Sequence, residues 1–175
     1  MTQPQYQPYR TIPLTQGQYA LVDESDYEYL NQWKWFAQKD CRSGAFYAVR
    51  EAFSQRYGIR RRQRAIRMHR QIAGDPEGMV VDHLDHNTLN NQRHNLRIAT
   101  HSENSFNVRK SNAIKSSQYK GVSWWAAKNR WRVMIMAKGK SKYIGRFRSE
   151  EDAARAYNEA AIKMHGEFAC VNVLD

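Results

Sequence analysis

Residues 81–107 read VDHLDHNTLNNQRHNLRIATHSENSFN and are dense in His, Asp and Asn. An apolar lead-in, MVVDH, runs into the polar stretch, and an apolar return, NLRIAT, follows it. Asn-rich loops form turns through their own side-chain hydrogen bonds, so a plain surface loop explains the polar composition but not the apolar flanks. The pattern predicts two short strands around a polar loop, followed by a helix in HSENSFNVRK (residues 101–110).

A structural zinc site is one alternative for this stretch, because it holds four histidines, His83, His86, His94 and His101. Such sites usually combine Cys and His at recurrent pair spacings, and this stretch offers neither a cysteine nor such a spacing. Zinc is therefore the weaker interpretation. The two cysteines of the chain, Cys41 and Cys170, form no CxxC pair, which argues against a disulfide framework and indicates a reducing cytoplasm.

The composition points to a polyanionic partner. The chain of 175 residues fits one domain or two small ones, and its net charge is +11. Residues 1–67 and residues 116–175 each carry 11 basic and 6 acidic side chains, whereas residues 68–115 carry 6 and 5. Positive flanks on both sides of a nearly neutral polar centre favour a nucleic acid over the alternative, a plain basic surface. RNA ranks below DNA.

Neither a membrane span nor a secretion signal is expected. No apolar run approaches the roughly 20 residues that a spanning helix needs. The N-terminal segment MTQPQYQPYR lacks the apolar centre of a signal peptide. We therefore expect a protein that is not secreted and that works in the cytoplasm of a cell, a host cell if the chain is phage-encoded.

The segment before the polar stretch is predicted to be a small α+β unit. TIPLTQGQYALVD suggests strand, turn and strand, DESDYEYLNQW begins a helix, and KWFAQ with GAFYAVR forms a strand pair. The aromatic residues here fill a core rather than stack on bases; they are Trp33, Trp35, Phe36 and Tyr47. AIRMHRQIAG forms a short scaffold helix that includes His69.

Arginine is concentrated just before and within that helix, at positions 56, 60, 61, 62, 64, 67 and 70, without one acidic residue between them. Guanidinium groups bind phosphate oxygens through two parallel hydrogen bonds, although such a run is often only a solvated surface. The candidates for DNA contact are Arg60, Arg61, Arg62 and Arg64 here, and Arg93 and Arg97 in the polar stretch, where plain surface charge is the alternative.

The last sixty residues show a different pattern. YKGVSW, RWRVMIM and KYIGRF are strand candidates, and SEEDAARAYNEAAIKMHG is a helix with Ser149 as N-cap and Gly166 at its end. We expect a three-stranded antiparallel sheet that packs on this helix and leaves a basic face for a DNA groove. The stripe predicted to face the sheet comprises Ala153, Ala156, Tyr157, Ala160, Ala161 and Met164.

The polar stretch resembles the HNH nuclease family, whose ββα-metal fold has the order strand, loop, strand, helix. The matching residues are Asp82-His83, Asn95-Leu96 and Asn104, and the surrounding sequence is similar to the phage and intron homing-endonuclease branch. An imidazole is largely neutral at pH 7 and suits His83 as general base. Asp82 and Asn104 offer hard oxygen ligands for magnesium or manganese. The resemblance implies that Asn95 braces the loop that holds His83.

The C-terminal segment, residues 117–173, resembles the Apetala/ethylene-response-factor DNA-binding domain of plants through YKGV, IGRF, EEDAARAYNEAA and HGEFACVN. The resemblance implies that its sheet lies in the major groove of DNA. Ser123 stands where the plant pattern has Arg and Met134 where it has Glu, so the plant sequence preference does not carry over. The DNA-binding candidates of this segment are Lys120, Ser123, Trp125, Arg130, Arg132, Met134 and Tyr143.

Together these features predict an α+β protein in which residues 1–110 hold the nuclease module, with its core at about 66–110, residues 111–118 form a linker and residues 119–175 bind DNA. The predicted function is a homing-type endonuclease that nicks or cleaves double-stranded DNA with a divalent metal ion. The alternative is a sequence-specific transcription regulator with a non-catalytic HNH scaffold. Whether the protein is a monomer or a homodimer stays open. His86 and His94 are weaker site candidates and are interpreted as solvated loop residues. His101 is a weaker candidate than His83 for contact with phosphate or metal.

Overall fold

The computed structural model describes residues 8–41, 43–56, 59–62, 65–108, 116–137 and 139–174, and only the backbone within 53–62. The chain divides into two compact units, Met1–Ala99 and Thr100–Asp175. No helix in the described part is long and apolar enough to cross a membrane.

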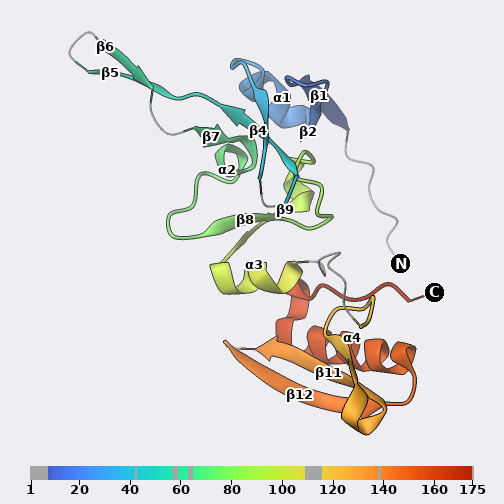
Figure 1. The fold of residues 1–175 in the computed structure, drawn as a ribbon. Coiled ribbons are helices and arrows are strands. Elements are labelled where there is room, and N and C mark those ends of the chain that lie inside the picture. Colours follow the sequence, from blue (N-terminus) through green and yellow to red (C-terminus); the bar gives the residue numbers. More distant parts are fainter. Residues whose placement is uncertain are drawn as a thin grey trace. The chain divides into compact units, whose positions relative to one another are not determined.

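The first unit is built from short antiparallel strands and two short helices (Figure 1). β1 (Tyr9–Pro13) pairs with β2 (Tyr19–Asp23), and α1 (Glu24–Leu30) follows directly. A second sheet has the order β3-β4-β7, with β3 at Phe36–Lys39, β4 at Phe46–Arg50 and β7 at Ile66–Arg67. The remaining elements are the hairpin β5 (Phe53–Arg56) and β6 (Ile59–Arg62), α2 (Met68–Ile72), β8 (Val80–His83), the 3-10 turn η1 (Arg93–Asn95) and β9 (Leu96–Ala99).

The core of the first unit joins residues that lie far apart in the sequence. Trp35 is 3% exposed and its indole donates a hydrogen bond of 2.8 Å to the carbonyl of Leu30, so the ring is buried with its polar edge satisfied. The predicted core role of this aromatic residue is thus confirmed. The core residues are Ile12, Ala20, Val22, Leu30, Trp35, Ala48, Met68 and Ile72.

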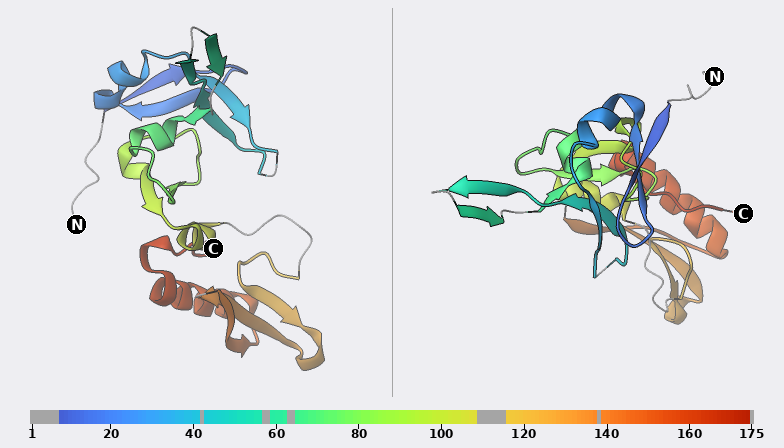
Figure 2. Two further views of the ribbon diagram at one scale, coloured as in Figure 1. Left: turned by 90° about the vertical axis from the view of Figure 1, so that its left-hand side faces the viewer. Right: turned by 90° about the horizontal axis from the view of Figure 1, so that it is seen from above.

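The second unit begins with α3 (His101–Asn107) and continues into a three-stranded sheet with a long helix (Figure 2). The strands are β10 (Val122–Trp125), β11 (Arg130–Ala137) and β12 (Lys140–Phe147), in that order and antiparallel. The 3-10 turn η2 (Ala126–Lys128) follows β10, and α4 (Glu150–His165) leads into η3 (Gly166–Phe168). The predicted sheet and helix are confirmed.

Helix α4 starts and ends as predicted but buries a slightly different stripe. Ser149 Oγ accepts hydrogen bonds from the amides of Glu151 and Asp152, and Gly166 follows the last helical residue. The buried positions are Ala153, Ala154, Tyr157, Ala160, Ala161 and His165. The expectation for Met164 was wrong: it is 37% exposed, because His165, one position further around the helix, turns inward instead.

One glycine lets the sheet approach α4 closely. Gly121 has a φ of +76°, and a Cβ built there would lie 2.1 Å from the Tyr157 ring and 2.8 Å from the Met134 carbonyl oxygen. Any other residue would therefore collide with the helix as well as strain the backbone.

The boundary between the units differs from the predicted linker. Ser117 is 7% exposed, its hydroxyl accepts a hydrogen bond from the Tyr119 amide, and the Ser116 hydroxyl accepts one from Trp124. Both serines thus belong to the second unit. Helix α3, predicted as part of the nuclease module, is also counted with this unit, because its contacts there include Lys120 and His165.

Candidate active site

The hairpin β8–β9 presents Asp82 and His83 on opposite sides. Antiparallel pairing sets Asp82 opposite Arg97 and His83 opposite Leu96. Neighbouring side chains of a strand point in opposite directions, and His83, only 5% exposed, faces the interior. The predicted order of strand, loop, strand and helix around these residues is confirmed.

Arg97 turns toward its cross-strand partner rather than toward solvent. Its Nε and Nη2 donate to Oδ2 of Asp82 at 3.0 and 2.7 Å, and the side chains are 10% and 12% exposed. Two charge-assisted hydrogen bonds from one guanidinium group to the same carboxylate oxygen limit the orientation of both side chains. The pair therefore fixes the direction of the Asp82 carboxylate at the end of β8.

His83 belongs to a cluster of three rings. The His69 ring, from α2, meets it edge-on with centroids 4.9 Å apart, and the Tyr47 ring, from β4, lies 5.6 Å from His69 and 6.4 Å from His83. His69 is 4% exposed. The cluster holds the imidazole of His83 from two sides, through residues of the preceding α+β segment.

Burial keeps both imidazoles neutral. It lowers the pKa of His69 to about 3, and electrostatic repulsion from the neighbouring His83, Arg67 and Arg70 side chains disfavours its charged form in the same direction. Burial also lowers the pKa of His83, against a hydrogen bond with Asn91 and the charges of Asp85 and Asp82, which raise it. A neutral imidazole has a lone pair that accepts a proton, which is what a general base needs.

Asn95 closes the polar loop. Its side-chain amide donates to Oδ1 of Asp85 at 2.9 Å and to the carbonyl of Asn90 at 2.8 Å, and its Oδ1 accepts from the Asp85 amide at 3.0 Å. Burial alone would raise the pKa of Asp85, but hydrogen bonds from Asn90, from the Asn87 amide and from Asn95 lower it overall. Asn95 is 3% exposed, so these bonds are shielded from water, as a bracing role requires.

The N-terminal strands hold this loop in place, a relation that sequence patterns did not reveal. Arg93 donates to both carboxylate oxygens of Asp26, at 2.8 and 2.7 Å. Asp23 accepts from Gln92 and from the Arg93 amide. In addition, Leu21 in β2 exchanges backbone hydrogen bonds of 2.8 Å with the loop. In the sequence, Asp23 and Asp26 indicate only the start of a helix. No local pattern predicts that they bind residues of the polar loop.

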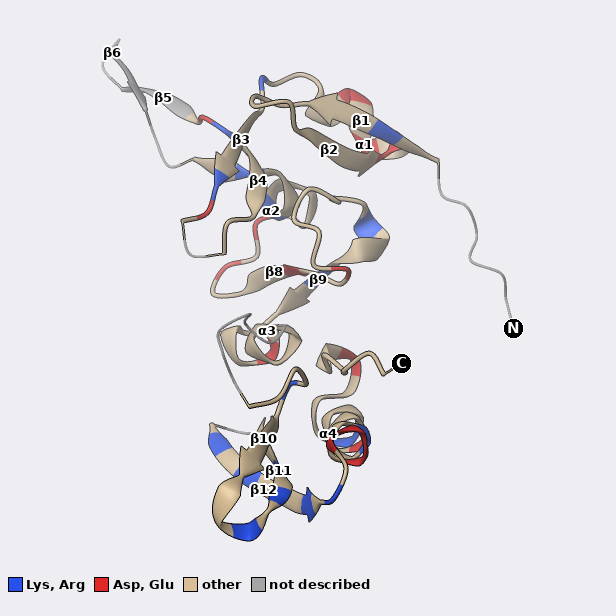
Figure 3. Ribbon diagram, turned by 45° about the vertical axis from the view of Figure 1, so that its right-hand side comes forward, with Lys and Arg blue, Asp and Glu red and all other residues tan. Residues whose placement is uncertain are grey.

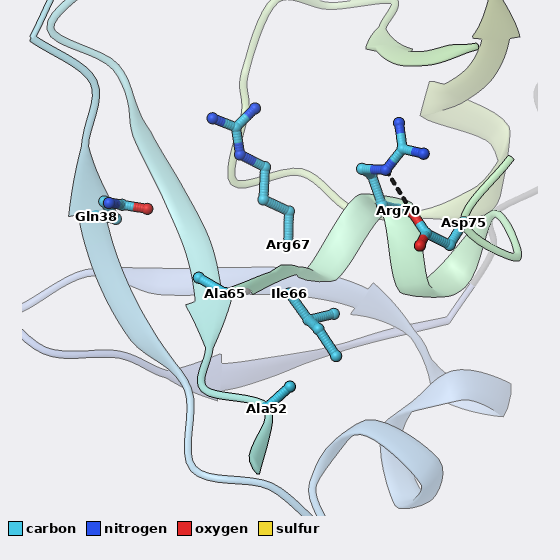
Figure 4. Close-up of a pocket in the computed structure, with 7 residues that line it drawn as sticks. All are labelled: Gln38, Ala52, Ala65, Ile66, Arg67, Arg70 and Asp75. Atoms are coloured by element: carbon cyan, nitrogen blue, oxygen red, sulfur yellow. Dashed lines mark hydrogen bonds and ion pairs between the residues drawn. The ribbon is translucent and has the colours of Figure 1, made fainter. Parts of the chain in front are cut away.

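Arg67 and Arg70 line a hollow of about 790 Å³ beside the ring cluster, together with Gln38, Ala52, Ala65, Ile66 and Asp75 (Figure 4). Arg70 binds Asp75 and the carbonyls of Pro76 and Met79. Arg67 is exposed and lies over the Tyr47 ring, 4.7 Å from its centroid, and has no acidic partner among the described residues. Its charge therefore lies beside Tyr47, one member of the ring cluster.

The metal ligands predicted from sequence supply oxygen donors. Asp82 is the second-last residue of β8, and Asn104 lies half-buried on α3 in the second unit. A carboxylate with an amide carbonyl is a donor set that fits magnesium or manganese and suits zinc poorly. The described residues contain no group of three or more His, Cys, Asp or Glu side chains arranged for a metal ion. Of the weaker candidates, His94 and His101 are exposed.

The predicted DNA contacts of the second unit gather on one face of its sheet. Cross-strand pairing joins Ser123 with Arg132, Trp125 with Arg130 and Met134 with Tyr143. Their β11 members alternate with Val133 and Ile135, which are buried in the core with α4. Blue segments, which mark Lys and Arg positions, recur along the ribbon around β11 and β12 in Figure 3. Lys120 lies apart from this group, with its amine bound to backbone carbonyls of α3. Arg60, Arg61 and Arg62 lie in β6, and their side chains, like all of Arg64, fall outside the described residues.

Comparisons with known proteins found similar proteins for different parts of the chain. A family model described as HNH endonuclease matches residues 73–106. An uncharacterized HNH endonuclease, L560, of Acanthamoeba polyphaga mimivirus is 40% identical over 100 residues, which are 57% of this chain and 50% of that protein. Protein 3.8 of Escherichia phage T7 is 36% identical over 125 residues, 69% of this chain and 98% of that protein. The chain thus spans half of the mimivirus protein and nearly all of the phage protein.

The second unit has relatives of a different kind. The AP2-like ethylene-responsive transcription factor TOE2 of Arabidopsis thaliana is 45% identical over 58 residues, which are 33% of this chain and 12% of that protein. The APETALA2-like protein 2 of Oryza sativa subsp. indica is 42% identical over 65 residues, 37% of this chain and 15% of that protein. The two sets of relatives differ in kind, which agrees with two separately folded units.

Proposed function

Because the chain belongs to the HNH endonuclease family and is thus a nuclease, we propose that it hydrolyses phosphodiester bonds of double-stranded DNA with a divalent metal ion. The observation that carries this proposal is the buried His83 next to Asp82 at the end of one strand, within the order strand, loop, strand and helix. The cleavage is proposed to be of the homing type, with His83 as the general base.

His83 performs the proton transfer. A water molecule aligned with the phosphorus loses its proton to the imidazole, whose orientation is set by the His69 and Tyr47 rings. Asn95 keeps the following loop closed, so that the backbone after His83 cannot shift when DNA arrives. His83 and Asn95 therefore have separate tasks, one in chemistry and one in positioning.

Asp82 and Asn104 would hold the metal ion, magnesium or manganese, which when bound neutralises charge on the phosphate and the leaving oxygen. Arg97 orients the Asp82 carboxylate through the buried ion pair. Arg67, exposed and without a carboxylate partner among the described residues, binds a backbone phosphate near His83. The sheet of the second unit positions the enzyme on DNA through Ser123, Trp125, Arg130, Arg132, Met134 and Tyr143.

The similarity of the second unit to plant transcription factors favours one other function, that of a sequence-specific regulator whose HNH part is silent. The two proposals differ in whether DNA is cut. Supercoiled plasmid is incubated with the protein and magnesium or manganese, and with EDTA as the metal-free control. Relaxed circles indicate a nick and linear plasmid a double-strand break.

His83→Ala tests the role of the base. We expect the rate of cleavage to fall by about 10² to 10⁴, the usual contribution of a general base, while plasmid binding in EDTA is retained. His94→Ala, which removes an exposed histidine of the same loop, is the matched control and should cut normally. If the wild-type protein binds plasmid but leaves it intact with either metal, the regulator is the better description.

A further inference from the structure

Lys120 binds the end of helix α3 instead of pointing into solvent. Its amine donates hydrogen bonds of 2.6 Å to the carbonyls of Phe106 and Val108. The last carbonyls of a helix lack partners within the helix and carry its negative end, so an ammonium group there is a charged cap. Two of the three donors of Lys120 are therefore committed within the protein. Burial lowers the pKa of this amine, as expected for a lysine drawn from solvent.

A second contact holds the same end of α3. The ring of Phe106 stacks flat on His165 of α4, with centroids 3.9 Å apart and planes at 2°. His165 is 8% exposed, and its Nε2 lies 2.7 Å from the Met136 carbonyl oxygen of β11. A cavity of about 390 Å³ is lined by Ser102, Ser105 and Phe106 of α3 together with Lys120, Met134 and Tyr157. α3 thus rests on the sheet and helix of its own unit.

Helix α3 needs such support because it is short. It has seven residues, whereas isolated helices below about 12 residues are marginal in water. Its first turn is stabilised by a capping box, in which Thr100 and Glu103 satisfy each other's backbone amides. Its last turn depends on Lys120 and on the stack of Phe106. Asn104 lies two residues before Phe106, about 200° around the helix, and so faces away from that stack.

We propose that Lys120, together with the Phe106–His165 stack, is a positioning device that holds α3 and its Asn104 in place from within the C-terminal unit. On this proposal, which rests on the nuclease function above, the C-terminal unit supports the cleavage step as well as DNA binding. In this proposal the Lys120 amine holds α3, and it does not make the DNA contact that the sequence resemblance implies. Substituting the lysine should therefore affect catalysis at saturating DNA more than affinity.

The test compares Lys120→Met with Lys120→Arg and the control Lys163→Met in the full-length protein. Lys163 is an exposed lysine of α4, so its substitution removes the same charge without touching α3. DNA affinity is measured in EDTA, and cleavage at saturating DNA over a magnesium titration. We expect Lys120→Met to retain its affinity, to cut about 10- to 100-fold more slowly, as small misplacements cause, and to need more magnesium. Lys120→Arg should recover part of the rate, and Lys163→Met should match wild type.

Hydrogen exchange of the α3 amides gives a readout that does not depend on activity. Lys120→Met should speed exchange at Asn104 and Val108 while leaving β11 protected. Should Lys120→Met fail to fold, Phe106→Ala removes the stack instead and is expected to give the same pattern. Weaker DNA affinity with an unchanged rate and unchanged exchange in either variant would overturn the proposal. A wild-type protein that does not cut at all would overturn the nuclease function, whereas faster α3 exchange would still support the cap.

Discussion

The ring of His69 meets the ring of His83 edge-on, with 4.9 Å between the centroids, and both side chains are buried. Two imidazoles in an interior resist protonation because a charge there would lose its hydration. This contact makes the stability of the first unit depend on pH.

Stability of the first unit should fall as the pH falls from 6.5 toward 3. The pKa of His69 is about 3 in the folded protein, so in this range the unfolded chain binds a proton that the folded chain does not. At pH 5 the loss relative to pH 7 is about 2 kcal/mol for this residue. Urea unfolding of wild type and His69→Leu at both pH values measures it. Met68→Leu, in the same turn, should keep the wild-type dependence, and an equal dependence in His69→Leu would contradict the assignment.

Asp26→Asn should loosen the loop of the active site. Asp26 is mostly buried and accepts two hydrogen bonds from Arg93. Because the Arg93 side chain is 60% exposed, its freed donors can bond water, and the substitution should cost about 1 kcal/mol. Thermal unfolding and plasmid cleavage should both report the change. The exposed pair of Arg10 and Glu24 is the matched control, and Glu24→Gln should have a much smaller effect. Equal effects of the two substitutions would show that the Asp26 pair has no special role.

Alanine substitutions of Arg67 and Arg70 should affect different properties, DNA binding for Arg67 and stability for Arg70. Arg67→Ala should weaken DNA binding and reduce the slope of log affinity against log salt by about 1, with little change in unfolding temperature. Arg70→Ala removes hydrogen bonds to Asp75, Pro76 and Met79 and should destabilise the first unit by about 1–3 kcal/mol. Salt-dependent binding and thermal melts separate the two. An unchanged salt slope in Arg67→Ala would remove the phosphate contact.

Arg132→Ala should weaken DNA binding by the second unit without altering its fold. Arg132 lies at the centre of the sheet face opposite α4, with its guanidinium 5.9 Å from the Trp125 ring centroid. The expected loss is about 1–3 kcal/mol of binding free energy. Arg155→Ala, on the exposed side of α4, should bind as wild type does. Equal losses in a gel-shift titration would mean that the sheet is not the binding face.

Gly121→Ala should destabilise the second unit far more than Gly139→Ala. Both glycines have φ near +70°, so both substitutions strain the backbone by about 1–2 kcal/mol. Only at Gly121 does a Cβ meet the Tyr157 ring, which adds about 1–3 kcal/mol of overpacking. Chemical denaturation followed by tryptophan fluorescence measures the difference, and similar midpoints would show that the helix moves aside freely.

Local patterns predicted most elements of this fold, because each depends on neighbours in the sequence. The apolar segments on either side of the polar loop predicted β8 and β9, and Ser149 with Gly166 predicted the ends of α4. The pairing of Arg93 with Asp26 was not predictable, since 67 residues separate them and neither side chain is unusual where it stands. Arg97 shows the same limit: only the register of β8 and β9 sets it opposite Asp82 and draws it inward.

The candidate site was predicted in its residue types and less in its surroundings. Resemblance to the HNH family singled out His83 and Asn95, but the matching motif contains no information on His69 and Tyr47, which reach His83 from other elements. Lys120 illustrates the converse, because a motif assigned it to DNA while the fold places its amine against α3. The roles of such residues depend on contacts with residues far away in the sequence, which local patterns do not contain.

The backbone bonds between Leu21 and the polar loop bear on how this nuclease can be reused. The family match covers residues 73–106, yet the shape of its central loop depends on a strand about seventy positions before that loop. A graft of the matched segment into another protein would carry the reactive residues but leave behind the strand that shapes their loop. The matched segment therefore depends on β2 for the shape of its loop, and its transfer into another protein should preserve that shape only when β2 is transferred as well.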